Sequence, residues 1–309
     1  MQEIIPPVEK SLLEAELTKE KFIRKTNNGN NLIYIFDHLN GPNLMNEVGR
    51  LREITFRDAG GGTGLASDID EFDLGDNPFS QLIVWNPEDK EIVGGYRFAS
   101  GENIVVTENG EVLSPTAELF DVSERFIREY LPWSIELGRS FVQPNYQPQI
   151  NLRKGMYSLD NLWDGLGAIV IDHPDTRFLF GKVTMYPHYD HLARDLVLYF
   201  LQKFFPDNDR LLVPKESLPL RHDKNYLESI FSGRTYEENL KILVQQVRAR
   251  NENVPPLVNA YMSLSSTMKT FGTALNRSFG DVEETGIIVT ISDIYDFKKD
   301  RHIATYKKE

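Results

Sequence analysis

Two periods of hydrophobic and polar residues recur along the chain and predict both kinds of regular element. Apolar runs of six to eight residues, some with alternating polar positions, are typical of β-strands. They are residues 31–37, 81–86, 91–98, 135–142, 177–183, 271–277 and 285–291. Segments with apolar residues three and four positions apart are typical of helices with one buried face. They are residues 43–56, 120–130, 158–171, 189–205 and 254–269.

The order of these elements predicts an α/β (α+β) fold. Strands 81–86 and 91–98 flank the turn residues 87–90 and read as an antiparallel hairpin. Strand 135–142, helix 158–171 and strand 177–183 read as a crossover between parallel strands. We therefore expect a central mixed, twisted sheet flanked by helices.

Residues 211–253 are charged and helical, and we expect them to form an insertion or lid within a single domain that spans residues 1–309.

Composition narrows the function classes. The net charge of −12 argues against a nucleic-acid partner. The chain has no cysteine, so disulfides, thiolate metal sites and a cysteine nucleophile are excluded. It shows no signal segment or apolar run of membrane-spanning length, so we expect a cytoplasmic protein with at most peripheral contact to the inner membrane.

Strand 135–142 carries the strongest candidate chemistry. Glu136 and Arg139 are three positions apart and should point to opposite faces of the strand. An ordinary buried strand with one ion-paired glutamate remains an alternative for this segment. No Gly-x-Ser-x-Gly elbow is present, and Ser140 lies within the strand, so a serine hydrolase is disfavoured.

Other motifs have weaker functional readings. The glycines of residues 60–64 follow a helix and lack the Lys-Ser/Thr of a phosphate loop, so we expect a flexible loop there. The acidic run 68–73 lacks the glycine and distal glutamate of a calcium loop. His188 and His191 have no further ligand nearby, so no metal site is expected.

Arg153, Lys154 and Gly155 precede helix 158–171 and offer a phosphate site at a helix start. A basic surface turn is an equal alternative.

The order of several motifs resembles known acyltransferases. The residues concerned are Arg52 and Phe56, Asp70 and Asp73, 94–97, and 136–139. This order is similar to that of acyl-homoserine-lactone synthases. A longer match to the hemolysin-like GNAT acyltransferases adds the motifs at 140–146, 162–166, 179–183, 255–261 and 300–302. That family includes the ornithine and glycine N-acyltransferases of bacterial aminolipid synthesis.

The resemblance implies a GNAT-like fold and assigns roles to residues. Glu136 would be the base that deprotonates an amine, and a backbone amide of Phe141 or Val142 would stabilise the oxyanion. Arg139 would join the catalytic group. Substrate-binding positions would be Arg52, Phe56, Asp70, Asp73, Arg97 and Ser140. A surface ion pair is the alternative for each charged member of that set.

The implied reaction moves a long (3-hydroxy)acyl chain from acyl carrier protein to the α-amine of a small amino acid. The segment 151–155 has one glycine and departs from the coenzyme A loop of GNAT proteins, which favours an acyl-phosphopantetheine thioester on a carrier protein over acyl-CoA. No permanently bound cofactor is expected. The opening motif 18–27 favours glycine, with ornithine next. An O-acyltransferase acting on the product would be a further partner.

Rival functions of other classes remain. They are an acyl-homoserine-lactone-type signal synthase, an acetyl-CoA-dependent GNAT enzyme and a non-catalytic hemolysin-like binding protein.

Overall fold

The computed structural model describes residues 1–307 and divides into two compact units. The first unit comprises Met1–Ile104, Trp133–Arg177 and the chain from Tyr295 onward. The second comprises Val105–Pro132 and Phe178–Ile294. The expectation of a single domain over 1–309 stays a prediction.

A five-stranded antiparallel sheet forms the centre of the first unit, in the order β1-β2-β3-β4-β6. The strands are β1 (Phe22–Lys25), β2 (Leu32–Phe36), β3 (Ser80–Asn86), β4 (Glu91–Ser100) and β6 (Ser134–Val142). Gly94 and Gly95 let β4 approach both neighbours closely. A Cβ on Gly94 would lie 2.4 Å from the carbonyl oxygen of Phe141, and one on Gly95 would lie 2.5 Å from that of Leu82.

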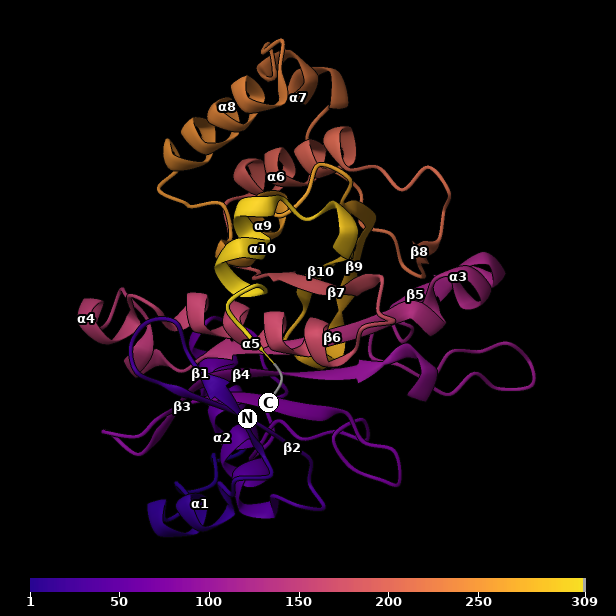
Figure 1. Cartoon of the computed structure of the whole chain (residues 1–309). Helices are drawn as coiled ribbons and strands as arrows, with labels where there is room; N and C mark the ends of the chain where they lie inside the picture. The colour runs from indigo at the N-terminus through magenta and orange to yellow at the C-terminus, as the bar shows by residue number, and fades with distance from the viewer. Residues whose placement is uncertain (308–309) are drawn as a thin grey trace. The chain divides into compact units, whose positions relative to one another are not determined.

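Helices α2 (Pro42–Asp58) and α5 (Ser158–Asp172) cover opposite faces of this sheet (Figure 1). The α2 face receives Gln81, which accepts a hydrogen bond from Arg52 of α2. The α5 face receives the neighbouring residue Leu82, whose methyl carbon would lie 2.7 Å from a Cβ on Gly165. Successive strand residues point to opposite faces, so the alternation along β3 assigns one helix to each side.

The remaining helices of the first unit are short. They are α1 (Lys10–Glu16), α4 (Leu152–Gly155) and α10 (Asp296–His302). Helix α10 packs on α5 at Gly167, where a Cβ would lie 2.2 Å from the carbonyl oxygen of His302. The His302 ring nitrogen Nδ1 lies 2.8 Å from Asp164 of α5. The charged tail is therefore held on the unit by buried polar contacts.

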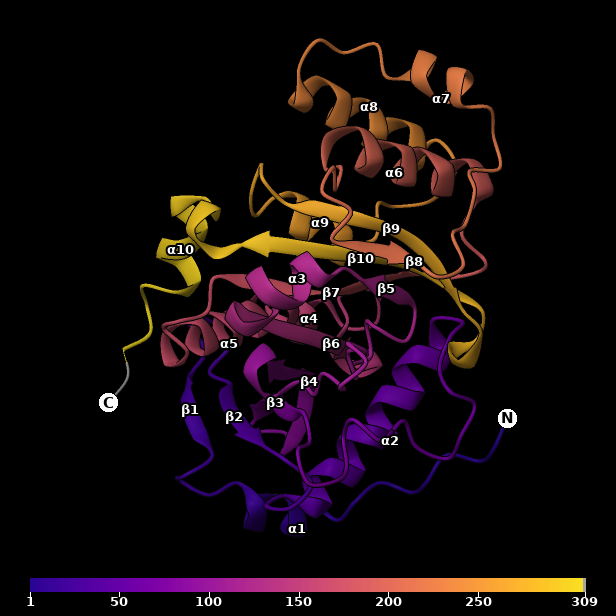
Figure 2. The ribbon, with the colours of Figure 1, turned by 90° about the vertical axis from the view of Figure 1, so that its right-hand side faces the viewer.

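The second unit contains a three-stranded antiparallel sheet in which β10 (Val282–Thr290) lies between β7 (Phe178–Met185) and β9 (Lys269–Asn276). Helix α6 (His191–Phe204) covers one face, where Arg194 pairs with Glu283. The opposite face receives Phe120 at Gly286. Figure 2 shows α7 (Lys224–Ile230) and α8 (Tyr236–Arg248) layered on α6. The other elements are β5 (Phe120–Val122), α3 (Glu124–Glu129), β8 (Leu212–Pro214) and α9 (Pro256–Met262).

The predicted fold class is confirmed: sheets flanked by helices, with most long elements within a few residues of their predicted bounds. Two predictions were wrong in detail. Residues 120–130 begin as the short strand β5, which pairs with β8, before α3 starts at Glu124. The helix expected over 254–269 ends at Met262, because Ser265 and Thr267 form a side-chain turn through the bond from the Thr267 amide to Ser265 Oγ.

The segment 211–253 contains β8, α7 and α8, and buries Leu227, Leu243 and Val247. Its role as an insertion or lid stays a prediction.

Candidate active site

One row of side chains crosses the sheet of the first unit on its α2 face. Gln81 of β3 lies opposite Arg97 of β4, and Arg97 lies opposite Gly138 of β6. Glu136 lies opposite Ala99, two residues along both strands. Directly opposed residues of antiparallel strands share a face, so Glu136 and Arg97 point to the same side of the sheet.

Arg52 reaches this row from α2 and is fully buried. Its Nη1 donates to both carboxylate oxygens of Asp73, at 3.1 and 3.0 Å, and its Nη2 donates to Gln81. Gln81 in turn donates to Asp73 at 2.9 Å. Charge-assisted bonds of this kind are stronger than neutral ones and fix both partners.

Arg97 is the second buried arginine and is 1% exposed. Its Nη1 donates to Asp70 at 2.5 Å and to Asp73 at 3.0 Å, and its guanidinium lies 5.5 Å from the centre of the Phe79 ring. Burial alone would raise the pKa of Asp73, but the charges of Arg52 and Arg97 outweigh it and hold that pKa well below its usual range. The Asp73 carboxylate is therefore ionised at any physiological pH.

Strand β6 contains a β-bulge in the middle of the candidate motif. Between the pairs Arg97–Gly138 and Gly95–Phe141, β4 has one residue, Tyr96, whereas β6 has two, Arg139 and Ser140. Arg139 adopts a φ of +52°, in the left-handed region that side chains other than glycine rarely occupy. Bulges are enriched beside active sites because they redirect side chains and amides.

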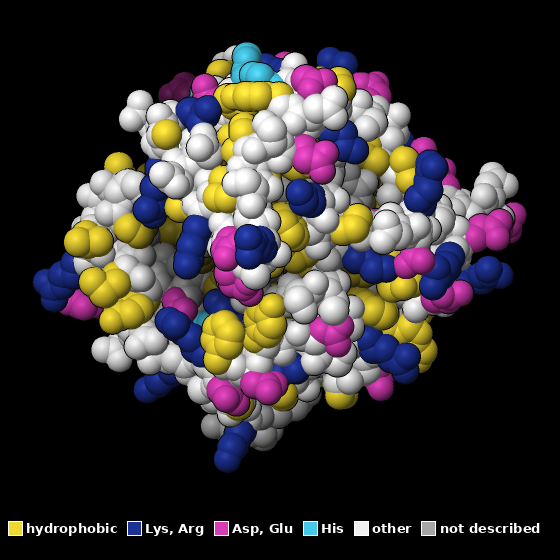
Figure 3. All heavy atoms as spheres, turned by 90° about the horizontal axis from the view of Figure 1, so that it is seen from above, with side chains coloured by type: hydrophobic (Ala, Val, Ile, Leu, Met, Phe, Trp, Pro, Cys, Tyr) yellow, Lys and Arg dark blue, Asp and Glu magenta, His cyan; other side chains and the backbone are white. Residues whose placement is uncertain are grey.

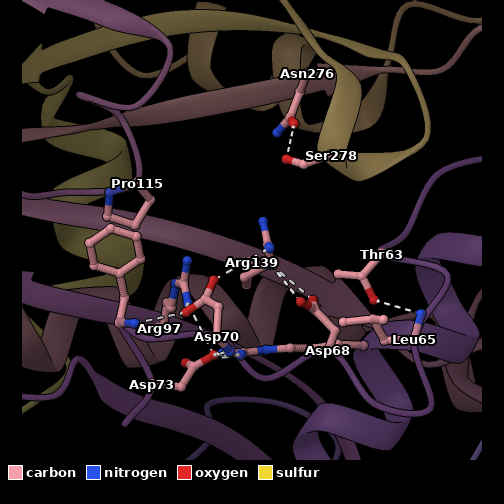
Figure 4. A network of polar contacts seen from close by, with 12 residues as sticks. Thr63, Leu65, Asp68, Asp70, Asp73, Arg97, Pro115, Arg139, Asn276 and Ser278 are labelled. Carbon is pink, nitrogen blue, oxygen red and sulfur yellow. Dashed lines mark hydrogen bonds and ion pairs between the residues drawn. The ribbon is translucent and has the colours of Figure 1, made fainter. Parts of the chain in front are cut away.

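Two aspartates hold the Arg139 side chain (Figure 4). Its Nε lies 2.9 Å from Asp68, and its Nη2 lies 3.5 Å from Asp70. Asp68 is fully buried, and burial raises the pKa of its carboxyl more than the nearby arginines, Arg139 first, lower it. Asp70 thus joins Arg97 to Arg139 in one network.

Glu136 is itself 1% exposed, and Phe141 beyond the bulge is 3% exposed. A buried carboxylate, arginines held by aspartates and a bulged strand are compatible with an acyl-transfer site, which requires a base, electrostatic orientation and oxyanion donors.

Comparisons with known proteins agree with an acyl-transfer reaction. A family model described as an acetyltransferase (GNAT) domain matches residues 51–154, which include Arg52, Arg97 and Glu136. Two curated relatives match the whole chain, and both are named glycine N(alpha)-acyltransferase. The protein of Phocaeicola vulgatus is 51% identical over 309 residues, covering 100% of this chain and 95% of its own length. That of Bacteroides thetaiotaomicron is 53% identical over 306 residues, covering 99% and 91%. The chain belongs to the GNAT acyltransferases.

Among solved structures, this acyltransferase is similar to a CoA-dependent acyl-homoserine lactone synthase, BjaI, solved with SAM and isopentyl-CoA. The identity is 13%, the TM-score is 0.40, and the match covers 88% of this chain and 89% of the other. The suspected family and the N-acyltransferase class are confirmed by the sequence relatives.

The structure brings together most of the predicted site residues of the acyltransferase. Arg52, Asp70, Asp73, Arg97 and Arg139 form one network of contacts. Arg52, Asp73 and Arg97 are buried, and the side chains of Arg139 and Asp70 are 15% and 22% exposed, so none of the five belongs to a fully exposed ion pair.

Phe56 is buried one turn beyond Arg52 on α2, Ser140 is one of the two bulged residues of β6, and Val142 lies just after the bulge. The substrate roles of Phe56 and Ser140 stay predictions.

The predicted phosphate residues lie apart from this network, on α4. Lys154 pairs with Asp89 at 2.7 Å and its ammonium lies 5.3 Å from the centre of the Tyr146 ring. Gly155 is buried, and Arg153 is exposed. Their role in donor binding stays a prediction.

Sequence reasoning missed three residues of the site. Gln81 and Asp68 complete the arginine network. Glu53, buried in α2, accepts bonds from the amides of Thr63 and Gly64 at 3.0 and 2.7 Å and from the Thr63 hydroxyl. The glycine loop is therefore fastened to α2, whereas a flexible loop was expected. A glutamate inside an amphipathic helix, seven residues before the loop, was the available signal.

Within residues 1–307, no group of three or more histidine or acidic side chains is arranged to hold a metal ion. No helix in the same range is both long and apolar enough to cross a bilayer.

Proposed function

We propose that this enzyme transfers a long (3-hydroxy)acyl chain from acyl carrier protein to the α-amine of glycine. The two full-length relatives named for glycine support the acceptor, and ornithine is the next candidate. The product would be an N-acylglycine, an amphiphile on which an O-acyltransferase could act.

One observation carries the mechanism: Glu136 is buried on the same sheet face as the arginine network, next to the bulge at Arg139. In the proposed reaction the amine nitrogen attacks the thioester carbon while Glu136 accepts the amine proton, directly or through one water. The amide of Phe141 or Val142 donates to the oxyanion, and collapse of the tetrahedral intermediate breaks the C–S bond and releases the thiol of the phosphopantetheine arm. The proton that the thiolate gains has no assigned donor.

Arg139 is the candidate partner for the acceptor carboxylate. Its side chain is 15% exposed, whereas those of Arg52 and Arg97 are 0% and 1% exposed. Its contact with Asp70 is also the longest in the network, at 3.5 Å. A partly exposed guanidinium with one long ion-pair contact can present two N–H donors to a carboxylate, which is the bidentate geometry used in amino-acid recognition.

The donor proposal is supported by the turn around α4. Lys154 is paired with Asp89, and Gly155 is closed against the 147–148 backbone, where a Cβ would lie 2.4 Å from the Pro148 nitrogen. Arg153 and the Asn151-capped turn remain for a single phosphate such as that of phosphopantetheine. This arrangement favours a carrier-protein thioester over coenzyme A, whose nucleotide carries more phosphate groups.

The test is to incubate the purified enzyme with acyl carrier protein thioesters or acyl-CoA and one amine at a time, and to identify products by mass spectrometry. N-acylglycine from the carrier-protein donor is expected. A lactone product, or a clear preference for acetyl-CoA, would contradict the proposal.

Glu136→Gln should lower kcat about a hundredfold or more, since it removes the base and preserves the side-chain shape. Glu283→Gln in the second unit is the matched control, because it neutralises another buried carboxylate that plays no part in the mechanism. A near-normal rate for folded Glu136→Gln would exclude Glu136 as the base.

A further inference from the structure

Residues 60–73, called the 60–73 loop below, follow α2 and are tied back to that helix near both ends. Near the end of the loop, Asp73 accepts from Arg52. Near its start, the amide of Thr63 donates to Glu53 at 3.0 Å. Arg52 and Glu53 are consecutive residues of α2, so a single position along the helix fixes both ends of the loop.

Glu53 anchors the loop with an ionised group inside the fold. Its side chain is 0% exposed, and it accepts from the hydroxyl of Thr63 and the amide of Gly64, each at 2.7 Å, and from Arg57 at 2.6 Å. Burial alone would raise the pKa of Glu53, but the bonds from Thr63, Arg57 and Gly64 outweigh it and lower that pKa. Hydrogen bonds to a carboxylate are stronger than neutral ones, so the loop is held firmly at this point.

Two glycines allow the loop to reach Glu53. Gly62 and Gly64 adopt φ values of +90° and +75°, in the left-handed region that favours glycine. A Cβ on Gly62 would also lie 3.3 Å from the Glu53 carboxylate. The glycine motif is thus accounted for by the bonds to Glu53.

The middle of the loop packs on α2 close to this anchor. The amide of Asp68 donates to the carbonyl of Gly49 at 3.0 Å, and a Cβ on Gly49 would lie 2.3 Å from the Ser67 hydroxyl oxygen. Gly49 is four residues before Glu53, which is about one helical turn. The contact that sets the backbone of Asp68 is therefore one turn from the bonds that hold the start of the loop.

The same loop carries the two carboxyl groups that hold Arg139. Asp68 lies 2.9 Å from its Nε, and Asp70 lies 3.5 Å from its Nη2. Figure 4 shows Thr63 on the Asp68 side of Arg139. A displacement of the loop at Thr63 would therefore move the groups that orient the Arg139 guanidinium.

Burial distinguishes Glu53 from the acidic side chains at the surface. On the face drawn in Figure 3, basic and acidic side chains are interspersed, and exposed charges of this kind interact weakly. The Glu53 carboxylate instead faces backbone amides of the loop. Its loss would leave those amides without their acceptor, which is the costly case for a hydrogen bond.

We propose that Glu53 positions the site for the carboxylate of the acceptor amino acid. The anchored loop sets the carboxyl groups of Asp68 and Asp70, and these aim the Arg139 guanidinium at the acceptor. This inference rests on the proposed role of Arg139 in acceptor binding. Glu53 acts through the loop and takes no part in the chemical step.

The experiment compares glycine with glycinamide, which has the same amine and no carboxylate, as acceptors for Glu53→Gln. The kcat/KM for glycine should fall about tenfold, mainly through a higher KM, because the glutamine presents N–H donors to the loop amides. The kcat/KM for glycinamide should stay within about twofold of the wild-type value, since an uncharged amide forms no ion pair with Arg139. A purely structural anchor would lower both values alike.

Thr63 gives a second, milder pair of variants. Thr63→Val keeps the side-chain volume and removes the hydroxyl bond to Glu53, so the preference for glycine should fall about threefold. Thr63→Ser keeps the hydroxyl and should retain the wild-type preference. This pair tests the proposal even if Glu53→Gln does not fold.

Glu47→Gln is the matched control. Glu47 is a buried glutamate of the same helix, but it accepts from the amide of Val8 at 3.1 Å and from Arg50 at 2.8 Å. Its replacement should leave both acceptors with wild-type kcat/KM.

Amide hydrogen exchange of the substrate-free enzyme supplies a measurement that needs no turnover. Exchange in the 60–73 loop should be faster in Glu53→Gln than in the wild type and unchanged in Glu47→Gln. Unchanged exchange in Glu53→Gln, or equal losses for glycine and glycinamide, overturns the proposal. A wild-type enzyme that forms no N-acylglycine contradicts the proposed function instead, and the exchange rates still decide whether Glu53 anchors the loop.

Discussion

Each unit of the acyltransferase contains a buried aspartate surrounded by donors, and the two clusters differ in what they hold. In the first unit Asp73 accepts from Arg52, Arg97 and Gln81. In the second unit Asp195 accepts from Arg194 and from the ring and amide of His222, and Arg194 pairs as well with Glu283 at 2.7 Å. Both aspartates are fully buried.

The surroundings of the two clusters suggest different roles: the Asp195 cluster anchors a turn, and the Asp73 cluster lies beside the proposed catalytic residue. The donors of the Asp195 cluster bind the 219–222 turn to α6, through the amides of Arg221 and His222 and the carbonyl of Pro219. The Asp73 cluster instead lies on the sheet face of Glu136 and connects through Asp70 to the bulged residue Arg139. Buried ion pairs therefore occur in both units, and the irregular strand beside Glu136 is what distinguishes the cluster proposed as the active site.

The largest expected effect is the loss of the Asp73 carboxylate. Asp73→Ala leaves the guanidiniums of Arg52 and Arg97 buried without their shared partner, which should lower the free energy of unfolding by about 3–5 kcal/mol. Urea unfolding measures this loss, and acyl transfer should fall with it. A loss below about 1 kcal/mol would mean that Gln81 and Asp70 suffice to hold the arginines.

The corresponding change in the second unit should affect stability and spare catalysis. Asp195→Ala should lower the free energy of unfolding by about 2–3 kcal/mol, less than Asp73→Ala because Arg194 keeps its bond to Glu283. The kcat of the folded fraction should remain that of the wild type. A tenfold decrease in kcat would show that the contrast between the clusters is wrong.

Acid should weaken both clusters, in the same direction. Burial raises the pKa of Asp73 and of Asp195. The neighbouring arginines, together with His222 at Asp195, lower each pKa by more than burial raises it. The folded pKa thus lies below the unfolded value of about 3.9, so this stabilisation is complete at neutral pH and is lost as the pH falls below about 4. Asp73→Asn should flatten the decline of stability between about pH 4 and pH 2.5, measured by urea unfolding. An unchanged slope would argue against ionised Asp73 as the centre of the network.

The smallest expected effect concerns the backbone of the bulge. Arg139→Ala removes the ion pair with Asp68 and keeps a Cβ at a φ of +52°, whereas Arg139→Gly removes the ion pair and the strain. The glycine variant should therefore be more stable than the alanine variant by about 1 kcal/mol. Both should lose activity. Equal stability of the two would indicate that the bulge relaxes once the side chain is gone.

Much of the fold was readable from the sequence because long periodic segments leave few choices. Helix α5 and strands β3, β4 and β6 were predicted within two residues of their observed bounds. The short strands β1 and β5 were not predicted, since three or four residues become a strand only by pairing with a partner. Ser265 and Thr267 could have signalled the end of α9, as they are turn formers.

The site was predicted in part of its membership and not in its geometry. The motif order named Arg52, Arg97, Arg139, Asp70 and Asp73, which meet in one network, and it did not name Asp68 or Gln81. Nothing in the sequence placed two residues of β6 opposite one of β4, because a bulge depends on the register between strands. The pair Gly94-Gly95 was the nearest signal, since such glycines permit close approach of neighbouring strands.

The left-handed conformation of Arg139 links a side-chain charge to main-chain geometry. The ion pair with Asp68 holds the side chain of the residue at which β6 changes direction, so neutralising the Asp68 carboxylate would shift the peptide planes that follow Arg139. The nuclear magnetic resonance signals of the Phe141 and Val142 amides would then report the ionic state of a side chain more than seventy positions earlier in the chain.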